Sequence, residues 1–198
     1  MSFVNYNSKE IISKIVFYGP SLGGKTTNIQ YIDKYTNEAS KGKLISMKTE
    51  TERTLFFDFL PLLLGNVNDF NVRFHLYTVP GQIFYETSRK LLLKGVDGLI
   101  FVADSTRARY EENIESMNSL IKDLHILNID IVDLPMVIQY NKRDLDSALP
   151  VSELCHVINK VNAPEYEAVA SQGIGVFETL KGISKIVMAH IKSDIPRN

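Results

Sequence analysis

The pattern of hydrophobic and polar positions predicts strands that alternate with helices. Short apolar runs bounded by polar residues and turn signals are typical of buried strands. We expect such strands at 14–18, 98–104 and 135–140, and a shorter one at 167–170. Apolar residues recur at helical spacing elsewhere, which predicts helices at 25–40, 83–94, 110–127, 151–161 and 176–191.

The segment between the first two helices is less regular. Residues 41–53 are polar with little periodicity, so we expect an exposed loop. A strand is predicted at 56–62, where Pro61 indicates an edge position. A turn at 65–69 and an alternating run at 72–79 then predict a hairpin.

This order of elements predicts an α/β fold with a mostly parallel central sheet and helices on both faces. Loops that bind ligands gather at the carboxyl ends of such strands. No repeat, low-complexity tract or linker interrupts the pattern, so we expect a single domain over residues 1–198.

Composition narrows the class of protein. The 198 residues are 44% hydrophobic and 23% charged, with a formal net charge of −1, so no bulk attraction to nucleic acid is expected. Cys155 is the only cysteine, which fits a reducing compartment. No apolar run approaches the ~20 residues that cross a bilayer, and neither end carries a secretory or lipidation motif. We therefore expect a cytoplasmic protein without direct membrane insertion.

The segment 19–26, Gly-Pro-Ser-Leu-Gly-Gly-Lys-Thr, lies between a predicted strand and a predicted helix. In that context G-x-x-x-x-G-K-[ST] predicts a loop whose backbone N–H groups surround phosphate oxygens. Lys25 would place a positive charge on the β- and γ-phosphates, and the Thr26 hydroxyl can bind Mg²⁺. An ordinary strand-to-helix turn is the alternative, and the agreement of strand, loop and helix disfavours it.

Two further segments predict recognition of guanine. Asn141-Lys142-Arg143-Asp144 follows a predicted central strand, and the Asp144 carboxylate can accept hydrogen bonds from N1–H and the exocyclic amine of guanine. Asn141 can connect this segment to the phosphate loop, and the Lys142 stem can cover the base. Residues 167–171, with Ala170 and Ser171, could offer backbone N–H groups to the guanine oxygen.

Three segments together carry a resemblance to a family: G-P-x-x-x-G-K-T-T-N at 19–28, residues 50–59, and Thr-Val-Pro-Gly-Gln at 78–82. On these the chain resembles the Ras-like small GTPases over essentially its whole length, and within them the bacterial GTPases of polarity and gliding motility. The resemblance implies a three-layer Ras-like fold, with GTP or GDP and Mg²⁺ as ligands. The nucleotide contacts that it implies come from Gly19, Leu22, Gly23, Gly24, Lys25, Thr26, Thr27, Thr54, Gly81, Asn141, Lys142, Asp144, Ala170 and Ser171.

The resemblance also implies a mechanism. Thr54 matches the switch threonine that completes the Mg²⁺ shell, and Gln82 matches the glutamine that orients the attacking water. Arg53 matches an arginine finger supplied by the same chain, although taken alone it would be interpreted as a solvated loop residue. Release of the two switch segments on loss of the γ-phosphate makes such a fold a switch.

One position departs from the usual pattern of the family. Thr78 stands where an aspartate usually helps to hold Mg²⁺ through water, and a hydroxyl is a poorer partner for a dication. Either Mg²⁺ binds more weakly, or a nearby acid substitutes: Asp58, Glu50 or Glu52. We favour a water-mediated contact from Asp58, because a neighbouring strand could direct its side chain inward.

The expected function is therefore a slow GTPase with a roadblock-type activating partner, and with effectors on the switch face. By the same resemblance it would control polarity or motility and could be recruited to a cell pole. Two alternatives remain open, a nucleotide-binding scaffold with negligible hydrolysis and a P-loop phosphotransferase of another class.

Overall fold

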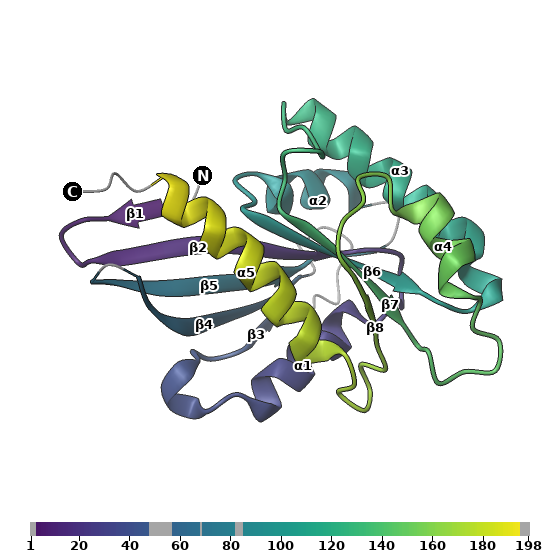
Figure 1. Cartoon of the computed structure of the whole chain (residues 1–198), viewed down its shortest axis with the longest axis horizontal. Helices are drawn as coiled ribbons and strands as arrows, with labels where there is room; N and C mark the ends of the chain where they lie inside the picture. Colours follow the sequence, from purple (N-terminus) through teal and green to yellow (C-terminus); the bar gives the residue numbers. More distant parts are fainter. Residues whose placement is uncertain (1–2, 48–56, 68, 82–84, 195–198) are drawn as a thin grey trace.

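The computed structural model describes residues 3–47, 57–67, 69–81 and 85–194. Its centre is a sheet with the strand order β3-β4-β5-β2-β6-β7-β8, and β1 pairs with β2 outside this path (Figure 1). The pairs β5–β2, β2–β6, β6–β7 and β7–β8 are parallel, whereas β1–β2, β3–β4 and β4–β5 are antiparallel. The strands are β1 (Phe3–Asn5), β2 (Glu10–Tyr18), β3 (Ile45–Met47), β4 (Phe57–Val67), β5 (Phe70–Thr78), β6 (Gly98–Asp104), β7 (Met136–Asn141) and β8 (Glu165–Glu167).

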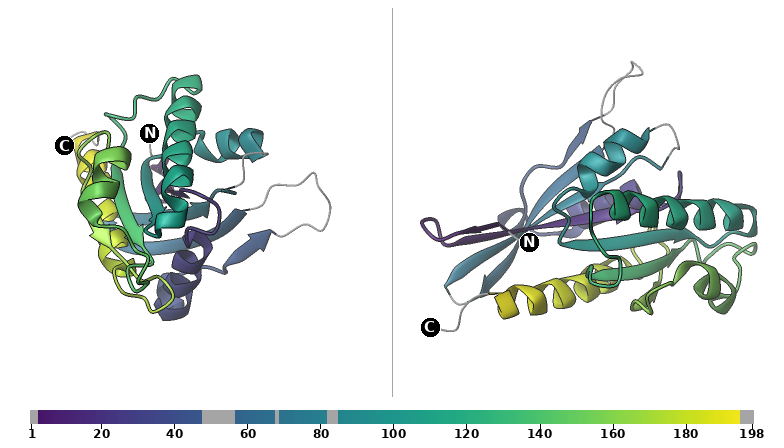
Figure 2. Two further views of the ribbon diagram at one scale, coloured as in Figure 1. Left: turned by 90° about the vertical axis from the view of Figure 1, so that its right-hand side faces the viewer. Right: turned by 90° about the horizontal axis from the view of Figure 1, so that it is seen from above.

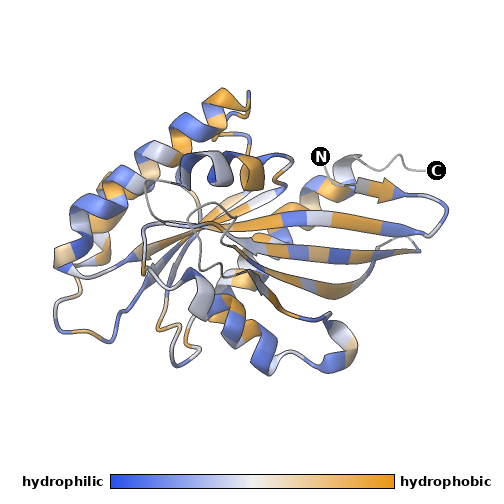
Figure 3. Ribbon diagram, turned by 180° about the vertical axis from the view of Figure 1, so that it is seen from behind, coloured by the Kyte–Doolittle hydropathy of each residue, from blue (hydrophilic) through white to orange (hydrophobic). Residues whose placement is uncertain are grey.

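Helices cover both faces of the sheet, so the fold is the expected three-layer α/β arrangement (Figure 2). One face carries two helices and the other carries three. The first pair is α1 (Lys25–Tyr35) and α5 (Val176–Asp194), and the second set is α2 (Glu86–Leu93), α3 (Tyr110–Ile126) and α4 (Val151–Ile158). The strands carry hydrophobic stretches interrupted by hydrophilic residues, and hydrophobic and hydrophilic residues alternate along the helices (Figure 3).

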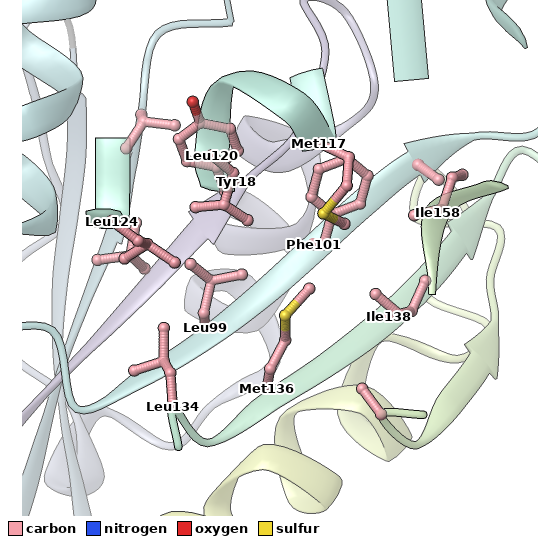
Figure 4. Close-up of a cluster of buried hydrophobic side chains, with 14 of the residues drawn as sticks. Tyr18, Leu99, Phe101, Met117, Leu120, Leu124, Leu134, Met136, Ile138 and Ile158 are labelled. Carbon is pink, nitrogen blue, oxygen red and sulfur yellow. The ribbon is translucent and has the colours of Figure 1, made fainter. Parts of the chain in front are cut away.

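Two hydrophobic clusters hold the layers together. On the face of α2, α3 and α4, side chains of α3 such as Met117 and Leu120 pack on Phe101 and Ile138 of the sheet (Figure 4). The central strands β6 and β7 are buried along their whole length, which explains why their apolar runs were recognisable in the sequence. Burial of this apolar area is the main stabilising contribution to the arrangement.

The structure corrects several predicted boundaries. The first helix ends at Tyr35 because Thr36 adopts an extended conformation, and only a short 3₁₀ turn, Glu38–Ser40, follows. The predicted loop at 41–53 contains β3, which forms a ladder with the start of β4. β4 therefore has neighbours on both sides at residues 57–59, where the prediction of an edge strand was wrong. Pro61 lies beyond this ladder, and its carbonyl accepts from the Gly42 N–H at 2.8 Å.

The hairpin is longer than predicted. The segment 65–67, expected to be a turn, continues β4 as far as Val67, with a change of register between Leu63 and Gly65. At the other end, β2 begins at Glu10 and pairs there with β1, which the polar N-terminus did not indicate.

The carboxyl ends of β2, β5, β6, β7 and β8 gather at one edge of the sheet, because these strands run parallel. Each of the predicted motifs in the described residues follows one of these ends. Within the described part of the chain, no helix is both long and apolar enough to cross a membrane.

Candidate functional site

The phosphate loop connects the end of β2 to the first turn of α1. Its backbone has positive φ at Gly19 (136°), Leu22 (60°) and Gly24 (105°), and the Gly23 N–H closes a turn on Pro20 O. Gly24 directly precedes α1 and has no side chain with which to cap the helix. The N–H groups at such a helix start attract anions, since they carry the positive end of the helix dipole.

Two glycines allow close approaches around this loop. A Cβ on Gly24 would lie 2.1 Å from Asn141 Nδ2, and a Cβ on Gly81 would lie 2.4 Å from the Ser21 backbone nitrogen. Gly24 also requires a left-handed conformation that other residues rarely adopt. Glycine is therefore needed at both positions for the segment after β5 and the last residue of β7 to touch the phosphate loop.

Lys25 is folded back into the loop that precedes it. Its Nζ donates hydrogen bonds to Gly19 O at 2.9 Å and to Pro20 O at 2.6 Å, and the residue is only 6% exposed. Burial, together with the positive charge of Arg89, lowers the pKa of Lys25 to about 7. An anionic ligand would compensate this cost of burying an ammonium group.

Hydroxyl groups from three segments meet on the Asp58 carboxylate. Thr26 Oγ1 donates to Asp58 Oδ2 at 2.6 Å, and Thr78 Oγ1 donates to the same oxygen at 2.9 Å. Ser46 Oγ donates to Asp58 Oδ1 at 2.7 Å. Asp58 itself is buried, and its backbone N–H donates to Thr78 Oγ1. The carboxylate thus lies directly beside the position at which the family's usual aspartate is replaced by threonine.

A pocket of about 330 Å³ opens between this cluster and the phosphate loop. Its donors are hard oxygen atoms and one ammonium group, the chemistry that suits a phosphate and a small divalent cation. In the described residues, no group of three or more His, Cys, Asp or Glu side chains forms a self-contained metal site. The pocket is lined by Ser21, Leu22, Gly24, Lys25, Thr26, Thr27, Phe57, Asp58, Thr78, Val79, Pro80 and Gly81.

Asn141, the last residue of β7, connects the phosphate loop to the loop after β8. Its Nδ2 donates to Gly23 O at 2.8 Å, and its Oδ1 accepts from the Ala170 N–H at 2.9 Å. Because both amide ends are used, the side chain fixes the spacing between the two loops. The Ala170 N–H is occupied by this contact.

A second pocket, of about 220 Å³, lies beyond Asn141. Lys142 has a positive φ of 65°, and its Nζ lies 2.5 Å from Oδ2 of the buried Asp104. This ion pair fixes the far end of the Lys142 side chain at the pocket, where Asp144 and Ser171 are exposed. The lining comprises Leu22, Gly24, Thr27, Asn141, Lys142, Asp144, Leu145, Val169, Ala170 and Ser171.

The two pockets form one extended site. Leu22, Gly24 and Thr27 line both of them, so the phosphate loop is their common wall. One end offers Lys25, Thr26 and Asp58, and the other offers Asp144. A ligand that bridges the ends would suit this lining with an anionic group such as phosphate at one end and hydrogen-bond donors at the other.

Three predicted residues, Arg53, Thr54 and Gln82, lie outside the described residues, as do the alternative acids Glu50 and Glu52. The described part of the site also contains two contributors that the sequence reasoning did not identify, Asp104 and Ser46. Asp104 ends an otherwise apolar strand next to the site, a signal that could have indicated it. Ser46 lay in a segment predicted to be a loop, where nothing in the sequence distinguished it.

Comparison with known proteins agrees with this geometry. The sequence model of the ADP-ribosylation factor family, Arf, matches residues 2–187. The chain is also 58% identical over 192 residues to the mutual gliding-motility protein MglA of Myxococcus xanthus (strain DK1622). That alignment covers 97% of this chain and 98% of the relative.

Proposed function

The chain belongs to the Arf family of Ras-like small GTPases, and we propose that it is a GTP-hydrolysing switch that controls cell polarity or motility. The family binds guanine nucleotides, and its members act with regulators and effectors. What we propose beyond this membership is the role of each residue, the place of Mg²⁺, the partner and the cellular process.

The observation that carries the proposal is the continuity of the site. One wall, the phosphate loop, serves both a pocket suited to phosphate and a pocket that holds a carboxylate. At the phosphate end, Lys25 would exchange its hydrogen bonds to Gly19 O and Pro20 O, in part, for contacts to phosphate oxygens. The N–H groups at the start of α1 would add the positive end of the helix dipole.

Mg²⁺ would bind beside Thr26. Because Thr26 donates its proton to Asp58, the oxygen lone pairs of the hydroxyl remain available for a cation. Asp58 would contact the ion through water and would orient Thr26, in place of the aspartate that Thr78 replaces. When bound, Mg²⁺ would neutralise charge on the β- and γ-phosphates.

The base would bind in the second pocket. The exposed Asp144 would accept from guanine N1–H and the exocyclic amine, and adenine lacks this pair of donors. Lys142, held by Asp104, would cover one face of the base with its apolar stem. Ser171, exposed beside the pocket, would offer its backbone N–H to the guanine oxygen.

Hydrolysis would depend on residues that we assign from the resemblance. Gly81 and Thr54 would contact the γ-phosphate, and Gln82 would orient the attacking water. Arg53 would stabilise the charge that develops on the transferred phosphoryl group, a role that typically accounts for ~10³–10⁵ in rate. Gly81 lies against Ser21 of the phosphate loop, which supports its role at the phosphate.

The proposed partner is a roadblock-type, MglB-like activator of hydrolysis that binds the switch face, where effectors would also bind. The name of the relative supports a role in gliding motility. We further propose that the protein works in the cytoplasm and reaches a cell pole through its partners, without contacting nucleic acid or inserting into membrane. Its net charge of −1 and its single cysteine support that placement.

Single-turnover hydrolysis of GTP tests the proposal. Wild type, Arg53→Ala and Gln82→Leu would be compared, each alone and with a roadblock-type protein. We expect slow hydrolysis by wild type, acceleration by the partner, and loss of the acceleration in either variant. Nucleotide binding without turnover in any condition would favour the scaffold alternative. Transfer of phosphate to an acceptor other than water would favour a phosphotransferase.

A further inference from the structure

A set of buried polar side chains lies behind the phosphate loop. Asn28 on α1, Gln139 on β7 and Thr179 on α5 are each 0% exposed, although they lie among the hydrophobic side chains that join these elements. Burial of an amide without hydrogen-bond partners is costly, so such groups are retained only when their bonds are complete.

The hydrogen bonds of this set are complete for the two amide groups. Asn28 Nδ2 donates to Gln139 Oε1 at 2.8 Å, and Gln139 Nε2 donates back to Asn28 Oδ1 at 3.0 Å. The second N–H of Gln139 donates to Thr179 Oγ1 at 2.9 Å, and Thr179 in turn donates to Gly175 O. The second N–H of Asn28 donates to Gly24 O at 3.0 Å. Every amide hydrogen is therefore used.

This set contacts the nucleotide site directly. Gly24 is the last glycine of the phosphate loop, and its carbonyl accepts both from the Asn28 side chain and from the Asn28 backbone N–H. Gln139 and Asn141 are two residues apart on β7, so they project to the same face of the sheet. One face of β7 thus reaches the loop twice, through Asn141 to Gly23 O and through Gln139 and Asn28 to Gly24 O.

Apolar side chains of similar volume would fill this space without the need for hydrogen bonds. What an amide pair adds is a fixed distance and orientation between the elements that carry it, because hydrogen bonds are directional. The three elements are those that lead from or to the nucleotide-binding loops. α1 follows the phosphate loop, β7 precedes Asn141, and α5 follows the loop that contains Ser171.

We propose that Asn28, Gln139 and Thr179 are positioning residues, which hold the phosphate loop in register with the base-binding segments and so slow the release of guanine nucleotide. The network touches no ligand and acts through the Gly24 carbonyl and through the position of β7, the strand that carries Asn141. The inference rests on the proposed function, since it concerns the affinity of the same site.

The test uses a double variant, Asn28→Leu with Gln139→Met, which removes both amides together and leaves neither partner buried alone. Replacing both members of a buried pair can be nearly neutral for stability. Release of a fluorescent methylanthraniloyl-GDP would be followed after addition of excess GDP, and Tm would be measured in parallel. We expect release to accelerate roughly five- to ten-fold, the effect of about one net hydrogen bond, with Tm close to that of wild type.

Tyr140→Phe is the matched control. Tyr140 adjoins Gln139 on β7 but projects to the opposite face, where its hydroxyl donates to Glu165 at 2.7 Å. The control should leave the release rate unchanged whatever it does to Tm. If the double variant does not fold, Thr179→Val tests the proposal instead. This change removes the acceptor for Gln139 and keeps the side-chain volume. Faster release in this variant supports the proposal.

If the folded double variant released nucleotide at a rate within two-fold of wild type, the proposed role of the network would be wrong. If the double variant does not fold, a release rate within two-fold of wild type in Thr179→Val would have the same meaning. Failure of the wild-type protein to retain GDP at all would instead refute the proposed function, so the two failures are distinguishable.

Discussion

The Thr26 hydroxyl donates a 2.6 Å hydrogen bond to Asp58 Oδ2, although the two residues are 32 positions apart in the chain. The contact joins the start of α1 to β4 and places a carboxylate beside Thr78. A carboxylate on a neighbouring strand therefore lies beside Thr78, the position at which this chain lacks the usual aspartate of the family.

This relationship predicts the effect of Asp58→Asn on the Mg²⁺ requirement. An amide keeps the size of the side chain but removes the charge. The loss of a hydrogen bond to a charged group should raise the Mg²⁺ concentration that half-maximally slows GDP release by roughly ten-fold or more. Asp69→Asn, at the exposed hairpin turn, is the control and should leave that concentration unchanged. An unchanged Mg²⁺ requirement in Asp58→Asn would exclude a role of Asp58 at the ion.

Asp144→Asn should alter the choice of base. Asparagine can donate a hydrogen bond where aspartate can only accept, and xanthine carries a carbonyl in place of the exocyclic amine of guanine. We expect affinity for GDP to fall by roughly 10²-fold or more, while affinity for xanthosine diphosphate (XDP) rises. The neighbouring Asp146→Asn, also exposed, is the control. Equal losses for GDP and XDP would argue against a direct contact between Asp144 and the base.

Gly24→Ala should prevent tight nucleotide binding. The added Cβ would meet Asn141 Nδ2 at 2.1 Å, in a backbone conformation with φ of 105°. Gly95→Ala is the control that distinguishes backbone strain from a steric clash. Gly95 also has a positive φ, 71°, but a Cβ there meets nothing within 4 Å. The control should lose only the ~1–2 kcal/mol of a left-handed non-glycine residue and keep its GDP affinity. Titration with fluorescent GDP would compare the two, and similar affinities would contradict the role assigned to the close approach.

Cys155 should react slowly with thiol reagents. Its hydrogen bond to Glu165, and secondly burial, raise the pKa of the thiol above the ordinary 9.0. Because the thiolate is the reactive form, alkylation of Cys155 at pH 8 should be slower than that of free cysteine. The midpoint of the curve of alkylation rate against pH should lie above pH 9.0. Glu165→Gln removes the negative charge and should lower the thiol pKa, which accelerates alkylation.

The control for Cys155 is Glu178→Gln, an exposed change on another helix. It should have no effect on the rate. If Cys155 of the wild-type protein were alkylated as fast as free cysteine, the hydrogen bond between the thiol and Glu165 would not persist in the dissolved protein.

The central strands and the motifs that follow them could be predicted from the local sequence. β6 and β7 are buried on both faces, so their residues are hydrophobic almost throughout and need no partner to be recognised. The phosphate loop and the segment at Asn141 depend on local chemistry: glycines that permit tight turns, and polar residues at the end of an apolar run. Both were therefore identifiable without knowledge of the fold.

The peripheral strands and the partners within the site depend on contacts between distant parts of the chain. β1 and β3 have three residues each and exist because a longer strand pairs with them, and that pairing leaves no local pattern. The contact between Asp58 and Thr26 depends on how β4 lies beside the start of α1, which the sequence does not state. The bond between Asn28 and Gln139 spans 111 positions. Such contacts depend on which elements the fold brings together, and a single sequence does not state that.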